Sequence, residues 1–199
     1  MYNLTYDKIK SAYEKKGYTF HSEKMIVNIG SIRKENGTIN KFDDLLFDAW
    51  IDENGKENLK VYNGTTDPGL KYLLTPMNPR GCACKVPGQY LNVYKIAKHR
   101  GDHWALCQVG SFAVYRDNNK DNKYDFIPSS IEKGCGFGIN RHRAALHIIV
   151  DDINGYSAGC SVFENSDNQE DEIKLCRKQI DFTGKITFDE TLFIESEVA

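Results

Sequence analysis

The sequence lacks any apolar run long enough to cross a membrane, and its first residues, MYNLTYDKIK, lack the charged-then-apolar layout of a secretory signal. We therefore expect no membrane span and a protein made in the cytoplasm of the producing cell. A strong charge of either sign is also missing, because the formal net charge is −2. This balance excludes a general electrostatic attraction to nucleic acid or to an anionic membrane.

Cysteine pairs with the spacing of a structural zinc site are missing as well. The six cysteines, at positions 82, 84, 107, 135, 160 and 176, include no C-x-x-C pair. A disulfide framework is not expected in a chain of 199 residues without a secretion signal. The sequence therefore predicts reduced thiols, and it predicts no cofactor.

What the sequence does contain is typical of a soluble, globular protein. Apolar residues make up 40% and charged residues 27%, and eleven Tyr with ten Phe favour a strand-rich fold. We expect one compact unit, with residues 1–42 forming an N-terminal helix and lead-in strand and residues 43–199 forming the main domain.

The periodicity predicts a mainly β protein of the α+β class with a helix near each end. Residues 5–16 place Ile9, Ala12 and Tyr13 on one helical face, with Thr5 or Asp7 as cap and a stop at residue 17. A second helix is predicted over 171–180. Strands are predicted at 25–32, 45–51, 59–62, 89–96, 103–109, 112–115 and 185–188, whereas 63–69 and 71–85 are predicted to be a loop and an irregular stretch.

Two compact, glycine-punctuated motifs carry the chemistry. The run G-I-N-R-H-R over 138–143 contains His142, and Y-S-A-G-C-S-V-F over 156–163 contains Cys160. A thiol is a strong nucleophile only as thiolate, so it needs a base or a positive neighbour. A sharp turn at Gly159 and Cys160 could aim N–H groups at the oxygen of an attacked carbonyl. Acyl transfer through Cys160 is the leading hypothesis, against a cysteine that is only a small buried hydrophobe beside a solvated basic turn.

In order and spacing, His142, Ser157, Gly159 and Cys160 resemble the signature of the YkuD-type L,D-transpeptidases, a histidine followed after about fifteen residues by Ser/Thr-His-Gly-Cys. The run V-P-G-Q-Y over 86–90 is similar to that family's entry into a core strand. The chain also resembles a group of bacteriophage-encoded proteins, through T-T-D-P-G (65–69), P-G-Q-Y (87–90) and S-A-G-C (157–160). It departs from the family where Ala158 replaces a histidine and Arg143 a glycine.

The resemblance implies a YkuD-like β-sandwich in which Cys160 attacks an amide carbonyl of a peptidoglycan stem peptide and His142 moves the proton. It further implies that the N–H groups of Gly159 and Cys160 hold the oxyanion and that the carbonyl of Arg143 orients the imidazole. Ser157 belongs to the same catalytic motif. The expected substrate-binding residues, which flank these motifs, are Arg143, Arg141, Asn140 and Tyr156.

Transpeptidation, L,D-carboxypeptidase and endopeptidase reactions all remain open, because either an amine or water can resolve the thioester. The expected partners are peptidoglycan stem peptides, with a role in phage lysis or wall penetration after release or as part of a virion. The alternatives are a non-catalytic wall-binding or virion module on the same fold, and a cysteine amidase or protease acting on proteins.

Two metal sites are weaker hypotheses. Asp117, Asn119, Asp121 and Asp125 follow the start of a calcium loop, but the glycine and the bidentate glutamate of that loop are missing. A polar connection held by Asx turns is the default there. His99 and His103 lie four residues apart, as in some zinc sites, although Gly101 between them argues against one helical face.

Overall fold

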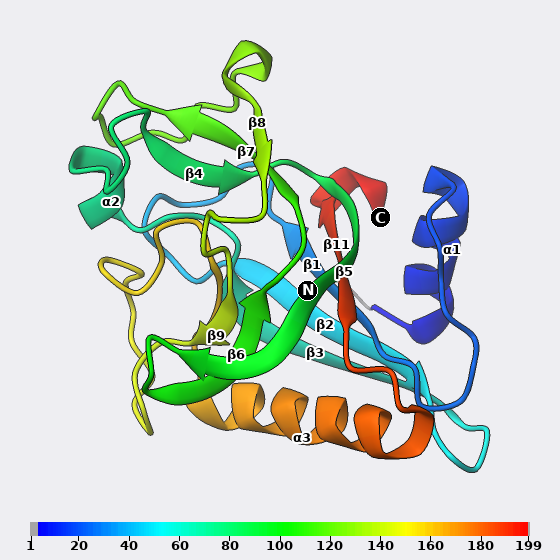
Figure 1. Ribbon diagram of the computed structural model, residues 1–199. Coiled ribbons are helices and arrows are strands. Elements are labelled where there is room, and N and C mark those ends of the chain that lie inside the picture. Colours follow the sequence, from blue (N-terminus) through cyan, green and yellow to red (C-terminus); the bar gives the residue numbers. More distant parts are fainter. Residues whose placement is uncertain (1–3, 199) are drawn as a thin grey trace.

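The structure, a computed structural model, describes residues 4–198 (Figure 1). Its elements follow in chain order. They are α1 (Tyr6–Lys16), β1 (Asn28–Arg33), β2 (Asp44–Ile51), β3 (Glu57–Thr65), α2 (Leu70–Leu74), β4 (Cys82–Lys85), β5 (Gly88–His99), β6 (His103–Gln108), β7 (Phe112–Asp117), η1 (Pro128–Ser130), β8 (Glu132–Gly134), β9 (Arg141–Arg143), β10 (Ser161–Phe163), α3 (Ser166–Thr183), β11 (Phe188–Ile194) and η2 (Glu195–Glu197).

The larger of two sheets closes on itself in the order β1-β11-β5-β6-β9-β10-β3-β2, and β4, β7 and β8 form a second, three-stranded sheet. In the closed sheet, β1 pairs with β11 and β9 with β10 in parallel, whereas the other neighbours are antiparallel. The predicted mainly β fold of the α+β class is thereby confirmed. Strands from both sides of the predicted boundary at residues 42 and 43 build this barrel.

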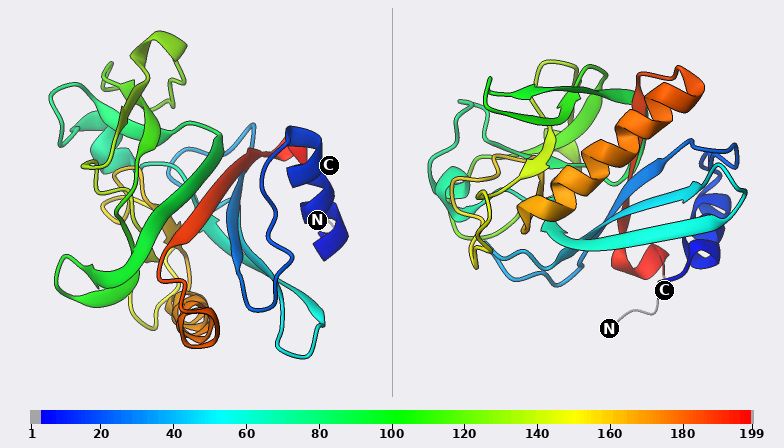
Figure 2. Two further views of the ribbon diagram at one scale, coloured as in Figure 1. Left: turned by 45° about the vertical axis from the view of Figure 1, so that its right-hand side comes forward. Right: turned by 90° about the horizontal axis from the view of Figure 1, so that it is seen from below.

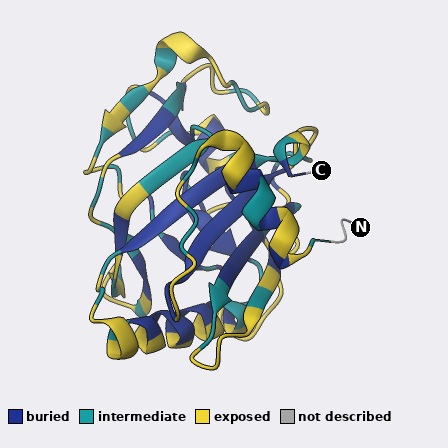
Figure 3. Ribbon diagram, turned by 90° about the vertical axis from the view of Figure 1, so that its right-hand side faces the viewer, coloured by how far each residue is buried: buried dark blue, intermediate teal, exposed yellow. Residues whose placement is uncertain are grey.

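The two long helices pack on different sides of the barrel, as Figure 2 shows. In α1, Ile9, Ala12 and Tyr13 are buried as predicted, and they pack with aromatic residues of the strands that include Phe47 and Phe193. Thr5 Oγ1 accepts the N–H of Lys8 at 3.2 Å, so Thr5 is the cap. Helix α1 lies against the outer face of the sheet, with its solvent side exposed (Figure 3).

The second predicted helix is confirmed but longer, because α3 begins at Ser166 and ends at Thr183. Ile173 and Cys176 face the core, as the periodicity requires. The helix runs beneath one end of the barrel in Figure 1. Within residues 4–198, no helix has the length and apolar character needed to cross a membrane.

The sequence prediction was wrong in several places. Residues 71–85 are not merely irregular, because they contain most of α2 and all of β4. The predicted loop at 63–69 begins with the last residues of β3, which pair with β10. The last strand runs over Phe188–Ile194 rather than 185–188, and the short strands β9 and β10 were not predicted.

The barrel interior contains charged side chains that no water reaches. Arg141 donates from Nε to Glu172 at 2.5 Å and from Nη1 to the Ser31 hydroxyl at 3.0 Å. Lys85 donates from Nζ to Glu190 at 2.7 Å and to the Ser161 hydroxyl at 2.5 Å. Buried charges are tolerated only when they are paired in this way.

The charge balance of this interior cluster depends on a third carboxyl group, that of Asp48. Burial raises the pKa of both Asp48 and Glu172, whereas Lys85 and Arg141 overcome burial and hold the pKa of Glu190 at about 2. Glu190 is therefore ionised, and Asp48 and Glu172 compete for the charge of Arg141.

Candidate active site

The parallel pairing of β9 with β10 brings the two predicted motifs side by side. In its register, Arg141 pairs with Ser161 and His142 pairs with Val162. Side chains alternate between the faces of a strand, so His142 and Val162 share the face opposite to Arg141 and Ser161. Cys160 directly precedes Ser161 and packs in one cluster with Val162. The predicted nucleophile and base therefore lie on the same face of neighbouring strands.

A tight turn presents Cys160. The Ser157 hydroxyl donates to the carbonyl of Cys160 at 3.0 Å and accepts the N–H of Gly159 at 3.2 Å. Gly159 adopts a φ of +120°, and a Cβ there would lie 2.3 Å from the carbonyl oxygen of Ala83 in β4. Only glycine fits both requirements. Ser157 thus holds the shape of the turn.

This turn changes one expectation for the oxyanion site. The N–H of Gly159 is engaged by the Ser157 hydroxyl, so it is not free to hold an oxyanion in this conformation. Of the two predicted donors, the N–H of Cys160 remains. A preformed two-donor site of the kind implied by the family resemblance would need the Ser157 hydroxyl to turn away.

The thiol of Cys160 is buried and neutral. Its Sγ donates to the carbonyl oxygen of Gly138 at 3.4 Å and accepts the N–H of Asn140 at 3.4 Å. Burial raises the pKa of Cys160, because its effect is larger than that of the hydrogen bond from Asn140, which lowers the pKa. Within the described chain, Sγ makes no hydrogen bond to His142. The pair is therefore a thiol beside an imidazole rather than a preformed thiolate–imidazolium ion pair.

In His142, Nδ1 carries the proton, which leaves Nε2 free to act as a base. Its Nδ1 lies 2.7 Å from the carbonyl oxygen of Arg143, and a carbonyl can only accept, so Nδ1 bears the hydrogen. Nε2 is then unprotonated, and it has no hydrogen-bond partner among residues 4–198. Burial, with His99 nearby, lowers the pKa of His142 to about 3. The imidazole of His142 is thus neutral, with Nε2 able to accept a proton, over the physiological pH range.

A second imidazole, from the β5–β6 hairpin, covers His142. The ring of His99 stacks on it with centroids 4.0 Å apart and planes 20° apart. Asn140 holds His99 in place by donating from Nδ2 to its Nδ1 at 2.9 Å, while the Oδ1 of Asn140 accepts the N–H of Gln108 at 2.8 Å. Asn140 therefore supports the imidazole that covers His142.

The sequence analysis missed the role of this hairpin. It treated His99 and His103 only as a weak zinc pair, but His99 pairs with His103 at the end of β5 and β6, next to His142. The rings of His99 and His103 are tilted by 41° with their centroids 5.4 Å apart, and Nδ1 of His99 is bonded to Asn140. Among residues 4–198, no three His, Cys, Asp or Glu side chains are arranged to hold a metal.

The structure places the other predicted site residues in different surroundings. Arg141 is a correction: it is fully buried and bonded inside the barrel, so it cannot bind a substrate carboxylate. Arg143 lines a surface pocket beside the site. Tyr156 is 39% exposed near the turn, and its N–H donates to the carbonyl of Ile153 at 2.9 Å.

The predicted calcium loop is held together by its own polar groups. Asn119 directs its amide Nδ2 at the carboxylates of Asp121 and Asp125, at 3.2 and 2.5 Å. An amide nitrogen cannot ligate a cation. Asp117 accepts the N–H of Asp125, and Asp121 accepts the N–H of Lys123 in an Asx turn. The loop has the default structure, a polar connection, and the calcium arrangement is not formed.

Comparisons with protein-family models, with curated proteins and with solved structures find no match to this chain. The assignment of a function therefore depends on the geometry of the site and on the motif resemblance.

Proposed function

We propose that this protein is a cysteine-dependent enzyme that acts on peptidoglycan stem peptides, by acyl transfer or by hydrolysis, in the manner of an L,D-transpeptidase. The observation that carries the proposal is the placement of Cys160 and His142 on one face of a parallel strand pair, with Nδ1 of His142 bonded to the carbonyl of Arg143. This contact leaves Nε2 as the acceptor that a general base requires.

In the proposed reaction, Sγ of Cys160 attacks an amide carbonyl carbon of the stem while Nε2 of His142 takes the thiol proton. The carbon–nitrogen bond then breaks, and His142 returns the proton to the leaving amine. The product is a thioester on Cys160. An incoming amine resolves it to a cross-link and water resolves it to an acid, with His142 accepting a proton in either case.

A rearrangement of the thiol completes the proposed site. In the proposed reaction, Sγ leaves the carbonyl oxygen of Gly138 and turns towards His142 by rotation about χ1 of Cys160. Empty enzymes often hold such hydrogen bonds in a long or misaligned state, and substrate binding tightens them. The proposed setting is a phage lysis or wall-penetration system, with stem peptides and lysis or virion components as partners.

The decisive experiment incubates the protein with muropeptides and follows the products by mass spectrometry. We expect new cross-linked or trimmed products from the unchanged chain, and none from Cys160→Ala or His142→Ala. Cys135→Ala is the matched control, because Cys135 is exposed and lies outside the site, and it should retain full turnover. An inactive wild-type protein, or an active Cys160→Ala variant, would contradict the proposal.

One observation favours a second function, a non-catalytic wall-binding or virion module on the same fold. Cys160 is buried with a raised pKa and bonds to Gly138 instead of His142. Labelling with a thiol-reactive probe separates the two functions. An enzyme should label at Cys160 at neutral pH at a rate that falls at least tenfold in His142→Ala, whereas a binding module should leave Cys160 unlabelled in both.

A further inference from the structure

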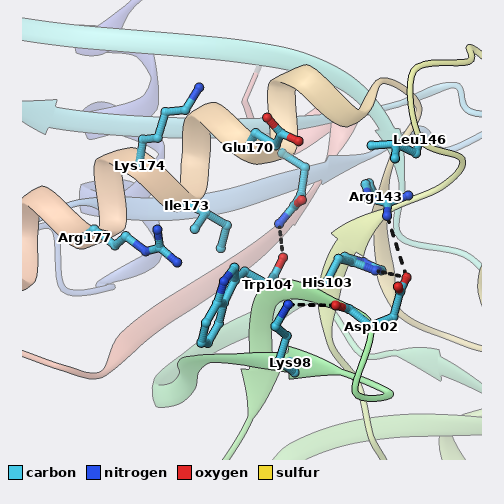
Figure 4. Close-up of a pocket in the computed structure, with 11 residues that line it drawn as sticks. Lys98, Asp102, His103, Trp104, Arg143, Leu146, Glu170, Ile173, Lys174 and Arg177 are labelled. Carbon is cyan, nitrogen blue, oxygen red and sulfur yellow. Dashed lines mark hydrogen bonds and ion pairs between the residues drawn. The ribbon is translucent and has the colours of Figure 1, made fainter.

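A pocket of about 350 Å³ lies between β6 and α3, close to the candidate active site. Trp104 of β6, Ile173 of α3 and Leu146 form apolar walls, and Figure 4 shows the charged side chains at its rim. Trp104 and Leu146 are 46% and 47% exposed, so the apolar surface is open to a ligand. We refer to this cavity as the β6–α3 pocket.

The β6–α3 pocket has more positive than negative side chains. Its basic residues are Lys98, Arg143, Lys174 and Arg177, and its acidic residues are Asp102 and Glu170. Arg143 pairs with Asp102 at 3.7 Å, and Lys174 pairs outside the pocket with Asp171 at 3.4 Å. Lys98, Arg177 and Glu170 have no salt-bridge partner within residues 4–198, which leaves two cations against one carboxylate.

The two cations, Lys98 and Arg177, both lie close to the ring of Trp104. Nζ of Lys98 lies 5.0 Å and the guanidinium carbon of Arg177 lies 5.2 Å from the ring centre of Trp104. The ring holds both charges at the mouth of the pocket without neutralising them. An anion entering there could make a charge-assisted contact with one of these cations.

The β6–α3 pocket is connected to the candidate base through two residues. His103 lines the pocket, and the centre of its ring lies 6.0 Å from that of His142. Its Nε2 is buried without a hydrogen-bond partner among the described residues, which is a position that a ligand could satisfy. Arg143 also lines the pocket while its carbonyl oxygen holds Nδ1 of His142.

We propose that the β6–α3 pocket binds a free carboxylate of the substrate peptide and selects for peptides that carry one; this rests on the proposed function. Lys98 and Arg177 supply the charge, and the guanidinium suits the planar, two-oxygen shape of a carboxylate. Trp104, Leu146 and Ile173 contact the aliphatic chain that carries it. An inorganic phosphate offers the same charge but has no alkyl part for these walls.

Binding is best measured without turnover, on the Cys160→Ala chain, by calorimetry. The probes are a synthetic stem tetrapeptide with free carboxylates, the same peptide with its carboxylates converted to amides, and inorganic phosphate. We expect the amidated peptide to bind about tenfold more weakly, which is the usual loss for one charge-assisted contact. Equal affinity for the acid and the amide, or phosphate binding as tightly as the acid, would overturn the proposal.

A matched pair of variants on α3 localises the site. Arg177→Gln should weaken binding of the free acid about tenfold and leave the amide unaffected. Lys178→Gln removes the neighbouring charge, which lines a different cavity, and should change neither affinity. A loss of equal size in both variants would indicate a general charge effect and contradict the assignment. Thermal melting confirms that each variant is folded.

Fluorescence gives an independent reading, because Trp50 is the only other tryptophan. In Trp50→Phe, emission from Trp104 should change saturably with the acid and only weakly with the amide. The two proposals can also fail separately. Selective binding by Cys160→Ala without turnover by the wild type would refute the enzyme but keep the pocket. Turnover that is unchanged by Arg177→Gln and by amidation of the peptide would refute the pocket but keep the enzyme.

Discussion

The two faces of the β9–β10 pair present opposite solutions to burying polar groups. On the inner face, Arg141 and Ser161 belong to a network of charges in which each ion has a close partner. On the outer face, His142 and Cys160 are almost as deeply buried, yet both are neutral and neither is bonded to the other. The same three-residue strand pairing therefore has a fixed ionic network on one face and a neutral thiol and imidazole on the other.

This difference indicates that the inner face stabilises the fold and that the outer face carries the reactive groups. A buried ion that loses its partner is strongly destabilising, so the inner face tolerates little change. A neutral thiol and a neutral imidazole cost less to bury than ions do. We expect substitutions on the inner face to act on stability and those on the outer face to act on chemistry.

The largest effect should come from Arg141→Met. Removing the guanidinium leaves Asp48 and Glu172 without their main counter-charge and leaves Glu190 with Lys85 alone. We expect a loss of about 3–5 kcal/mol in the free energy of unfolding. Urea denaturation measures it. Lys60→Gln, which breaks an exposed pair with Asp171, is the control and should cost less than about 1 kcal/mol. A small loss at Arg141 would mean that the inner network is not structural.

The next largest effect tests the turn that links the two faces. Gly159→Ala must place a Cβ against Ala83 at a φ of +120°, and we expect a cost of about 2–3 kcal/mol in unfolding free energy. Thiol labelling of Cys160 should change as well. Gly184→Ala, at a φ of +73° with open space around it, is the control and should cost about 1 kcal/mol without altering labelling.

A smaller, pH-dependent effect should arise from the outer face. The pKa of His142 is lowered from 6.5 to about 3 by burial, so the unfolded chain binds this proton at a higher pH than the folded chain. Its contribution to stability is complete above pH 6.5 and is lost as the pH falls towards 3. The difference in unfolding free energy between the wild type and His142→Gln should therefore shift by about 3 kcal/mol between pH 7 and pH 4.

Chemical denaturation at a series of pH values measures this shift. A pH-independent difference between the two proteins would show that His142 is not buried as a neutral base. It would also remove the distinction between the inner and outer faces, because the outer face would then carry a charge.

Much of the fold was predictable from local pattern. The face of α1 that carries Ile9 and Tyr13, the cap at Thr5 and the hairpin between β2 and β3 follow from spacing and turn chemistry that act within a few residues. The strands β4, β9 and β10 did not follow. Three or four residues carry too little periodicity, and only pairing with distant partners defines such short strands.

The sequence by itself determined that a histidine and a cysteine stand in glycine-rich motifs, because those residue types and spacings are local properties. Only the tertiary structure decided that Arg141 belongs to the core, that Asn140 and His99 support the base, and that Cys160 rests on Gly138. Which face a side chain occupies depends on strand register, and burial, which sets each pKa, depends on residues far away in the chain.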